Sequence, residues 1–402
     1  MPLPLSHIRV LDLSRVLAGP LCTQYLADMG ADVIKVEPPG RGDDTRDWGP
    51  PFAVPRDGDM PGISAYFMCV NRGKQSVTID LTTARGQELL RDLAAKSDVM
   101  IENFKVGGLK KYGLDYASIK TINPKIVYCS ITGFGQTGPY ANRAGYDFVV
   151  QGMGGLMSVT GFPGQGPVRV GVAIADLTSG MNCCIGVLIA LAERERSGQG
   201  QWVKTSLLES QIAMLDFQAT RWLMDGVVPK QTGNDHPTGI ATGTYPSADG
   251  HINIGGAGGM MWTRFCQAIG AADLLDNPLF KEEEERRKNR DPLNARFIAI
   301  MKTRPSAEWI EILNRAGVPC GPINSIDQVF ADPQVQQLGI AQKVEHPRLG
   351  MQTLVGQAMT LSRTPSKLRT ATPEHGEHSE QILRELGYDE AGIKRLRERQ
   401  IV

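Results

Sequence analysis

The sequence has no excess of either charge, because 43 Lys and Arg residues balance 43 Asp and Glu residues among 402 in total. No net field therefore attracts nucleic acid or a charged membrane surface. Uninterrupted apolar runs stay below the roughly 18 residues of a membrane-spanning helix, and the nearest one, 181–192, is too short. The first residues carry neither a basic signal segment nor a transit-peptide pattern. We expect a cytoplasmic protein that binds neither nucleic acid nor membrane.

Metal-ligand and disulfide patterns are also missing. The seven cysteines are scattered without a Cys-x-x-Cys pair, and the six histidines have no metal-binding spacing. Most of the cysteines stand among apolar residues. We therefore expect reduced thiols in a hydrophobic core and no metal site.

Strands and helices alternate in the first half of the chain. A buried strand at 8–13, a helix at about 20–29 and a strand at 33–36 predict a βαβ unit with a parallel strand pair. The pattern continues with strand 76–81, helix 83–96, strands 98–102 and 126–131, strand 201–205 and a helix at about 207–225. This order predicts a Rossmann-like, doubly wound α/β domain, whose ligands usually lie beyond the carboxyl ends of the strands.

The composition changes after residue 225. A linker rich in Gly and Pro occupies 226–239, and a hairpin is predicted at 244–254 with its turn at Asp249-Gly250. Helices are expected near 260–269, 291–302 and 306–316, and the charged run 281–288 suggests a solvated helical face. We predict a large domain formed by 1–225, a smaller α+β domain at 226–325, and a segment 326–402 that returns to the large domain.

The stretch 168–192 brings one acidic residue, Asp176, to the start of a nearly uncharged helix that continues to about Leu191. A helix that is apolar on every side is expected to be buried. Asp176 could be an N-cap that accepts hydrogen bonds from the amides of Thr178 and Ser179. A cap does not exclude chemistry, since helix amides favour the anion and an ionised aspartate is a candidate nucleophile.

Four glycine-rich or basic stretches allow two interpretations each. Gly133–Gly138 matches Gly-x-Gly-x-x-Gly but precedes no helical pattern, so a loop is favoured over a dinucleotide site. The stretch 255–259 is either a flexible turn or a mobile lid. The loops 40–46 and 71–76 are ordinary salt-bridged loops or, with Arg15 and Lys111, a source of cations for a polyanionic ligand.

Several stretches resemble the family III (CaiB/BaiF-type) CoA-transferases over residues 6 to 360. They are 11–20, 33–46, 102–104, 143–147 and the segment around Asp176. The resemblance implies an interlocked homodimer in which each chain has a large Rossmann-like domain and a small domain. It also implies acyl-CoA and small carboxylic acids as substrates, with no permanently bound cofactor.

By this resemblance, Asp176 is the nucleophile. It would attack a donor acyl-CoA to give a mixed anhydride, and CoA thiolate would then convert the anhydride into an aspartyl-CoA thioester. Gly255, Gly256, Gly258 and Gly259 would form the lid over the aspartate. The residues that the family uses to contact CoA correspond here to Leu17, Ala18, Ile79, Asp80, Leu81, Thr82, Asn103, Phe104, Lys111, Ala144, Gly145, Tyr146 and Asp147.

Two departures from formyl-CoA transferases bear on the substrate. Leu17 replaces a glutamine near the reacting carbonyl and Pro38 replaces an arginine beside the nucleotide, which disfavours formate and oxalate. Other stretches of the sequence resemble the branch of the family that transfers CoA from succinyl-CoA to short dicarboxylates such as itaconate, glutarate, malate or citramalate. Cations for the second carboxylate would come from Arg15, Arg46, Arg72 or Arg143.

The sequence leaves rival functions open. Related racemases use a histidine where Tyr146 stands, and a neutral tyrosine is a poor base near pH 7, so an acyl-CoA epimerase or racemase is disfavoured. Two further rivals are an intramolecular CoA-transferase and a non-catalytic CoA-binding subunit in which Asp176 is only a helix cap. The sequence does not choose the acceptor acid.

Overall fold

The structure is a computed structural model that describes residues 2–56, 58, 62–256 and 258–402. The chain divides into two compact units. The large unit comprises Met1–Leu156, Arg169–Met224 and Gln336–Val402, and the small unit comprises Met157–Val168 and Asp225–Val335. The domain ranges derived from the sequence stay a prediction.

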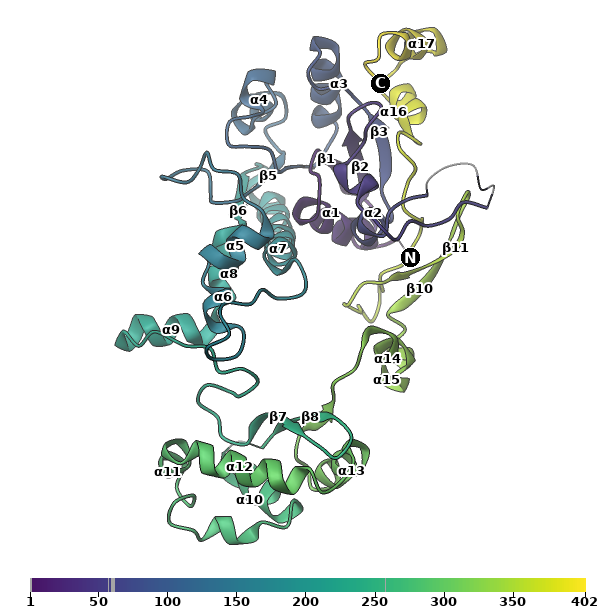
Figure 1. Cartoon of the computed structure of the whole chain (residues 1–402). Helices are drawn as coiled ribbons and strands as arrows, with labels where there is room; N and C mark the ends of the chain where they lie inside the picture. Colours follow the sequence, from purple (N-terminus) through teal and green to yellow (C-terminus); the bar gives the residue numbers. More distant parts are fainter. Residues whose placement is uncertain (1, 57, 59–61, 257) are drawn as a thin grey trace. The chain divides into compact units, whose positions relative to one another are not determined.

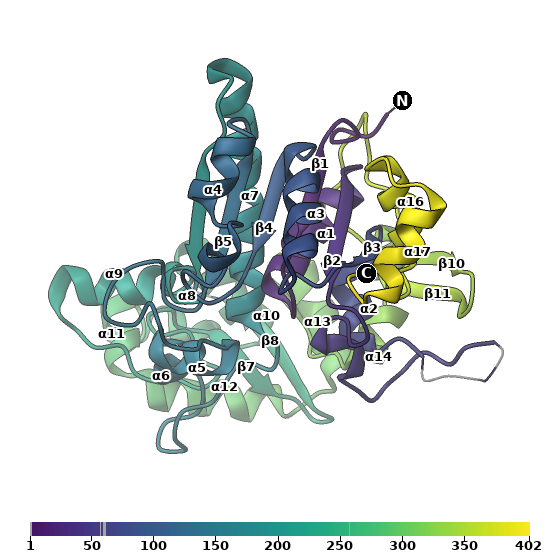
Figure 2. The ribbon, with the colours of Figure 1, turned by 90° about the horizontal axis from the view of Figure 1, so that it is seen from above.

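The large unit is built on a parallel sheet with the strand order β3-β2-β1-β4-β5-β6, six strands among the described residues. Figure 2 shows β5, β4, β1 and β2 in that order. Every neighbouring pair is parallel, which confirms the predicted mixed α/β fold with its βαβ units. The strands are β1 (Arg9–Asp12), β2 (Asp32–Glu37), β3 (Gln75–Thr78), β4 (Val99–Glu102), β5 (Val127–Thr132) and β6 (Trp202–Ser206).

Helices cover both faces of this sheet (Figure 1). Because side chains alternate along a strand, Val10 packs toward one helix layer and Leu11 toward the other. The first layer contains α1 (Ala18–Asp28), α5 (Asp147–Met153), α7 (Ile174–Ser197) and α8 (Leu207–Ala213). The second contains α3 (Ala84–Ala95), α4 (Tyr116–Ile122), α16 (Ser379–Glu385) and α17 (Glu390–Glu398).

Helix α7 differs from its prediction in two ways. It continues past Leu191 to Ser197, where Gly198 ends it in the left-handed conformation at φ 71°. It is also not buried on every side, since Met181, Ile185 and Ile189 are exposed. By length and composition α7 could cross a membrane, but half of its apolar window is buried within this chain and it packs on α1, which is typical of a core helix.

The segment predicted as one helix at 207–225 is two helices. Helix α8 ends at Ala213, and α9 (Asp216–Asp225) begins after a break at which Asp216 has φ 44°. The large unit also contains α2 (Ala65–Asn71) and the antiparallel hairpin of β10 (Ala341–His346) and β11 (Gly350–Val355).

The small unit has an antiparallel sheet in the order β7-β8-β9, with the predicted hairpin formed by its first two strands. The run 281–288 is exposed as predicted, apart from the half-buried Glu285 and from Arg286, which is buried and donates to the carbonyl of Phe280. The strands are β7 (Thr242–Pro246), β8 (His251–Gly255) and β9 (Cys320–Pro322), and the helices are α10 (Gly259–Ala268), α11 (Glu283–Lys288), α12 (Arg290–Met301), α13 (Ser306–Arg315) and α14 (Ile326–Ala331). Helices α6 (Leu156–Val159) and α15 (Pro333–Leu338) lie where the chain passes from one unit to the other.

Candidate active site

A cavity opens in the large unit at the carboxyl ends of β1 and β4. These neighbouring strands are the point at which the chain stops adding strands on one side of β1 and begins to add them on the other. This is the position at which open α/β sheets usually bind ligands. Asp176 lines the cavity from the start of α7. The other lining residues are Arg15, Val16, Leu17, Ala18, Asn103, Phe104, Lys105, Val106, Ile131, Thr132, Gly133, Ala141, Arg143, Ala144, Gly145, Tyr146 and Leu207.

A second cavity adjoins the first and shares Arg15, Phe104 and Lys105 with it. Its volume of about 450 Å³ lies within the range of ligand pockets. Its remaining lining comes from the loops after β1, β2, β3 and β4, including residues 35–38, 41–44, 79–82 and 108–112 in part. Together the two cavities provide an extended path that leads from a basic loop region to Asp176.

Asp176 is not the N-cap of α7. The helix begins at Ile174 with Ala173 as its N-cap, so Asp176 lies inside the first turn. The hydrogen bonds from Thr178 and Ser179 amides that a cap would accept are not formed, and among the described residues no hydrogen bond to the Asp176 carboxylate is found. The prediction that Asp176 caps the helix is therefore wrong.

Asp147 takes part of the role of a cap from a different helix. Its Oδ1 accepts a hydrogen bond of 2.8 Å from the amide of Ala175, and its Oδ2 accepts one of 2.8 Å from Gln151 Nε2. Gln151, fully buried, also accepts from the Val170 amide and donates to the Val172 carbonyl. Helix α5 thereby fixes the backbone that leads to Asp176.

Burial and then the charge of Asp147 raise the pKa of Asp176 to about 7. The expectation that helix amides keep this carboxylate firmly ionised is therefore wrong. A carboxylate with a raised pKa is more basic than an ordinary aspartate, and at neutral pH a large fraction of it is still the anion. The group can attack an electrophilic carbonyl, which fits the chemistry expected of a nucleophile.

Most residues predicted to contact CoA line one of the two cavities. The first cavity contains Leu17, Ala18, Asn103, Phe104, Ala144, Gly145 and Tyr146. The second contains Ile79, Asp80, Leu81, Thr82, Lys111 and again Phe104. Asp147 lines neither cavity, because its carboxylate is directed to the start of α7. That these residues contact CoA stays a prediction.

The structure separates the four arginines that are candidates for binding a substrate carboxylate. Arg15 and Arg143 line the first cavity with Asp176. Arg46 instead donates two hydrogen bonds of 2.7 Å to Glu37. Arg72 is buried and pairs with Asp28 at 2.7 Å. Arg46 and Arg72 are thus bound to carboxylates of the chain itself and line neither cavity.

The loop from Gly133 to Tyr146 closes one side of the first cavity. No helix follows its glycines until α5 begins at Asp147, which confirms the loop prediction for 133–138. A Cβ on Gly133 would lie 2.7 Å from the Cα of Gly145, and one on Gly145 would lie 2.6 Å from the Cα of Gly133. Both positions require glycine because the two backbone segments approach each other so closely.

The predicted lid belongs to the small unit, between β8 and α10. Gly255 ends β8, and the buried Gly256 donates its amide to the Ala241 carbonyl. Gly258 and Gly259 have φ of 73° and 52°. Ala257 lies outside the described residues. That this loop covers Asp176 stays a prediction.

Sequence reasoning missed several residues of this region. Lys105 lines both cavities, and its place directly after Asn103 and Phe104 was an available signal. Tyr66 was not foreseen either, although the charges of Asp176 and Arg169 act on its phenol. No local pattern brings α2, which carries Tyr66, next to the start of α7, so this proximity could come only from the folded chain.

Comparisons with known proteins identify the family of the chain. The sequence model described as CoA-transferase family III matches residues 5–379. The chain is 44% identical over 385 residues to the succinate–glutarate CoA-transferase of Agrobacterium fabrum, covering 95% of this chain and 96% of that protein. It is 34% identical to the succinyl-CoA–D-citramalate CoA-transferase of Chloroflexus aurantiacus, covering 100% and 98%. The crystal structure of a CaiB/BaiF family protein from Brucella suis superposes with a TM-score of 0.84 at 42% identity, covering 96% and 100%.

Proposed function

The chain belongs to CoA-transferase family III, and we propose that it moves CoA from succinyl-CoA to a short dicarboxylic acid such as glutarate or itaconate. The similarity to transferases that are named for succinyl-CoA, glutarate and citramalate supports this substrate class. The observation that carries the proposal is the position of Asp176. It stands at one end of two joined cavities whose walls contain the residues expected to hold CoA.

In the proposed arrangement, the nucleotide of CoA occupies the second cavity and the thioester reaches the first. Lys105 and Lys111 supply cations along the second cavity for the phosphates. Its wall also includes apolar side chains such as Ile79 and Leu81, against which an adenine ring can pack. The pantetheine arm would then pass Phe104 on its way to Asp176.

The reaction begins when the Asp176 carboxylate attacks the thioester carbonyl of succinyl-CoA and expels CoA thiolate. The product is a mixed anhydride of succinate and Asp176. The thiolate then attacks the aspartyl carbonyl, which releases succinate and leaves CoA on Asp176 as a thioester. The acceptor carboxylate attacks that thioester, and a second anhydride returns the acyl group of the acceptor to the thiolate. Asp176 is regenerated as the carboxylate.

The raised pKa of Asp176 favours this chemistry. A more basic carboxylate is a better nucleophile toward a thioester, as long as enough of it is ionised. Because the pKa is about 7, the ionised fraction grows as the pH rises from 6 to 8. Water must stay out while the anhydride exists, and the glycine loop 255–259 is the segment that we propose for closure.

The second carboxylate of a dicarboxylate requires a cation, and Arg143 is well placed to provide it. Arg143 stacks on Tyr140 at 3.8 Å from the ring centroid, and no ion pair engages it within the described ranges. We expect Arg143→Gln to lower kcat/KM for dicarboxylate acceptors by about 10- to 100-fold, because one charge-assisted contact is lost. Monocarboxylates of equal length should lose less than about threefold. Steady-state kinetics with matched acids provides the measurement.

Arg15 should behave like Arg143, because it also lines the first cavity, although it forms an ion pair with Asp44 at 3.2 Å. Arg41→Gln is the matched control, since Arg41 also pairs with Asp44 but lines only the second cavity. Equal losses for dicarboxylates and monocarboxylates in Arg15→Gln and Arg143→Gln would contradict the assignment of the second carboxylate to these residues.

The proposed function is tested by mass spectrometry of a reaction that contains succinyl-CoA and one acid from a panel of C4–C6 dicarboxylates. We expect one new acyl-CoA together with free succinate, formed by the wild type and not by Asp176→Ala. If no acid yields a new acyl-CoA, the proposed donor or the transfer reaction is wrong. Incorporation of deuterium at the α-carbon in heavy water would then favour an epimerase.

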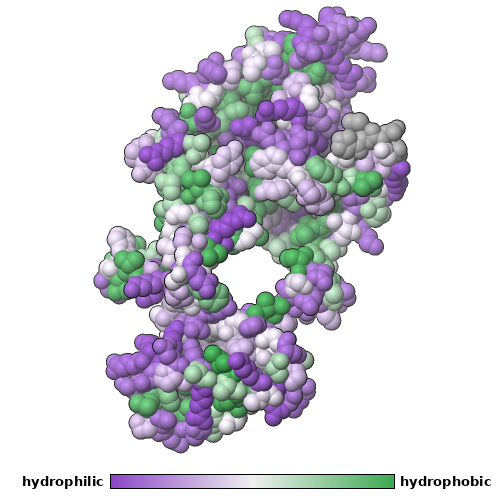
Figure 3. All heavy atoms as spheres, in the orientation of Figure 1, coloured by the Kyte–Doolittle hydropathy of each residue, from purple (hydrophilic) through white to green (hydrophobic). Residues whose placement is uncertain are grey.

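We further propose that two copies of the chain associate as an interlocked homodimer. The large unit exposes apolar side chains of α5, α7 and α9 that a monomer would leave in water, and Figure 3 shows hydrophobic residues at the surface in the region of α5 and α9. Such faces typically mark protein interfaces. Exposed members are Phe148, Val149, Met153, Met181, Ile185, Leu188, Ile189, Phe217, Trp222, Leu223 and Met224.

Charges on this face should weaken the dimer. We expect wild type to elute as a dimer in size-exclusion chromatography with light scattering, and the double variant Ile185→Glu, Ile189→Glu to shift toward monomer or aggregate. Glu195→Gln, an exposed change near the end of the same helix, is the control. A wild type that is monomeric at micromolar concentration would contradict the proposal.

A further inference from the structure

Val16 has an unusual backbone conformation in the loop that joins β1 to α1. Its φ is 69°, in the left-handed region, which a β-branched residue enters only at a cost in free energy. Val16 lines the first cavity together with Asp176. The strained residue therefore belongs to the wall against which a reacting acyl group would lie, and other groups must hold it in place.

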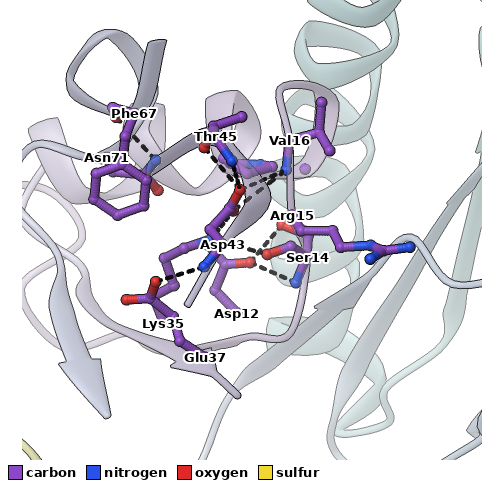
Figure 4. A network of polar contacts seen from close by, with 12 residues as sticks. Asp12, Ser14, Arg15, Val16, Lys35, Glu37, Asp43, Thr45, Phe67 and Asn71 are labelled. Atoms are coloured by element: carbon purple, nitrogen blue, oxygen red, sulfur yellow. Dashed lines mark hydrogen bonds and ion pairs between the residues drawn. The ribbon is translucent and has the colours of Figure 1, made fainter. Parts of the chain in front are cut away.

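A buried ion pair, formed by Lys35 and Asp43, holds the backbone of this loop. The Val16 amide is directed to the carboxylate of Asp43, at 3.3 Å from each oxygen. Lys35 Nζ donates to the Ser14 carbonyl at 2.9 Å and to Asp43 Oδ2 at 2.8 Å. The side chains of Lys35 and Asp43 are each only 1% exposed. In Figure 4 both residues lie beside the loop that runs from Ser14 to Val16.

The rest of the loop backbone is also bound by side chains. The Ser14 amide donates to Asp12 Oδ1 at 2.9 Å. Asn103 accepts from the Arg15 amide at 3.0 Å and donates to the Arg15 carbonyl at 2.7 Å. From the Ser14 amide to the Val16 amide, each backbone polar group thus has a side-chain partner. A surface loop needs no such arrangement, because water satisfies its polar groups.

The charge of Asp43 is firmly maintained. Burial acts to raise the pKa of Asp43, but the Lys35 ammonium and the hydrogen bonds to Thr45 lower it to about 2. Asp43 is therefore an anion at any working pH, and it attracts the Val16 amide with a full charge. Burying such a pair is costly, so its contribution to stability alone is a weak reason for its presence.

We propose that Lys35 and Asp43 are positioning residues that hold Val16 in its left-handed conformation and so set the cavity wall that faces Asp176. They also line the second cavity, so one pair shapes both the expected nucleotide site and the acyl site. Neither residue needs to touch the reacting atoms. Their effect on turnover rests on the proposed transferase function, whereas their effect on the loop does not.

The test uses glycine at position 16, because glycine adopts the left-handed conformation without the cost that a Cβ imposes. We expect Asp43→Ala to lower kcat by at least about tenfold, since small displacements of a reactive geometry reduce rates strongly. In the Val16→Gly background, the same Asp43→Ala change should lower kcat by less than about threefold. If Asp43→Ala reduces kcat by the same factor in both backgrounds, the proposal is wrong.

Asp28→Ala serves as the matched control. Asp28 and Arg72 form another buried pair of the large unit, with 4% and 5% of their side chains exposed, and they line neither cavity. Its removal should lower stability, and Val16→Gly should not change its effect on kcat. A rescue of Asp28→Ala by Val16→Gly as large as that of Asp43→Ala would indicate general stabilisation and overturn the proposal.

A crystal structure separates this inference from the proposed function, because it requires no turnover. In Asp43→Asn, which keeps an oxygen for Thr45 and serves if Asp43→Ala fails to fold, we expect Val16 to leave the left-handed region. In the double variant with Val16→Gly, residue 16 should keep its positive φ. If Val16 stays at positive φ in Asp43→Asn, the pair does not hold it. A wild type that transfers no CoA would overturn only the proposed function.

Discussion

Asp176→Asn should lower CoA transfer by at least about 1,000-fold while making the folded protein more stable above pH 7. The loss of transfer follows because an amide cannot replace the carboxylate as a nucleophile. The gain in stability follows because the wild-type carboxylate is partly buried, accepts no hydrogen bond within the described part of the chain, and lies near the charge of Asp147. A residue that was only a helix cap would show the opposite change in stability.

The stability effect depends on pH in a defined direction. In the unfolded chain Asp176 should titrate near its ordinary value of 3.8, whereas in the folded chain its pKa is about 7. Between these values the folded state keeps a proton that the unfolded state has lost, so the free energy of unfolding falls as the pH rises from about 4 to about 7. Asparagine does not titrate, so Asp176→Asn removes this fall in the free energy of unfolding.

Thermal unfolding midpoints at pH 5 and pH 8 provide the comparison. We expect the stabilisation by Asp176→Asn to be smaller at pH 5 than at pH 8, where it should reach about 4 kcal/mol at most, because each pH unit of the pKa shift corresponds to about 1.4 kcal/mol. Asp92→Asn, an exposed change in α3, is the control and should show no such trend. A variant that is less stable than wild type at pH 8 would indicate that the Asp176 carboxylate stabilises the helix.

Asp12→Ala should destabilise the large unit by about 3–5 kcal/mol, because it leaves a buried ammonium without its partner. Asp12 and Lys74 have side chains that are 0% exposed, with their charged atoms 3.1 Å apart. Asp12 also accepts hydrogen bonds from Ser14 and from the Thr23 hydroxyl. Chemical denaturation, with the free energy of unfolding extrapolated to water, provides the measurement.

Two further variants test whether the unpaired buried charge causes the loss of stability in Asp12→Ala. Glu380→Ala removes the exposed ion pairs that Glu380 makes with Arg384 and Arg397, and it should cost less than about 1 kcal/mol. Adding Lys74→Met to Asp12→Ala should recover part of the stability, because no unpaired charge is then buried. If Asp12→Ala costs no more than Glu380→Ala, the buried pair does not support the fold as described.

The sequence predicted the sheet well, because local patterns determine it. Apolar runs that end in turn residues identified the strands, and the predicted helices at 20–29 and 83–96 required crossover connections between parallel strands. Sequence patterns did not predict the seven-residue helices α2 and α4. Pro20 in the first turn of α1 and Gly30 after its end, at φ 106°, are signals of the same local kind. The residues expected to contact CoA came from the resemblance to family III CoA-transferases, and most of them line one of the two cavities.

The errors arose where distant segments meet. A sequence does not reveal that Asp147 from α5 binds the Ala175 amide, so it predicts for Asp176 a capping role that another residue partly takes. It likewise does not distinguish Arg72, which pairs with Asp28, from Arg143, which lines the cavity. The sequence predicted that α7 is buried on every side, but one apolar face of this helix is exposed. Apolar composition predicts burial without indicating whether this chain or a second copy would cover the face.

The central claim is that Asp176 forms acyl intermediates during turnover, first a mixed anhydride and then a CoA thioester, each of which hydroxylamine converts into the same hydroxamate. The direct measurement is a hydroxylamine trap: enzyme is mixed with succinyl-CoA, treated with hydroxylamine, digested with trypsin and analysed by mass spectrometry. We predict a hydroxamate on Asp176 in the peptide that spans residues 170–194, formed only when the donor is present. Turnover of the donor with no modified Asp176, or with a hydroxamate on a different residue, would contradict the claim.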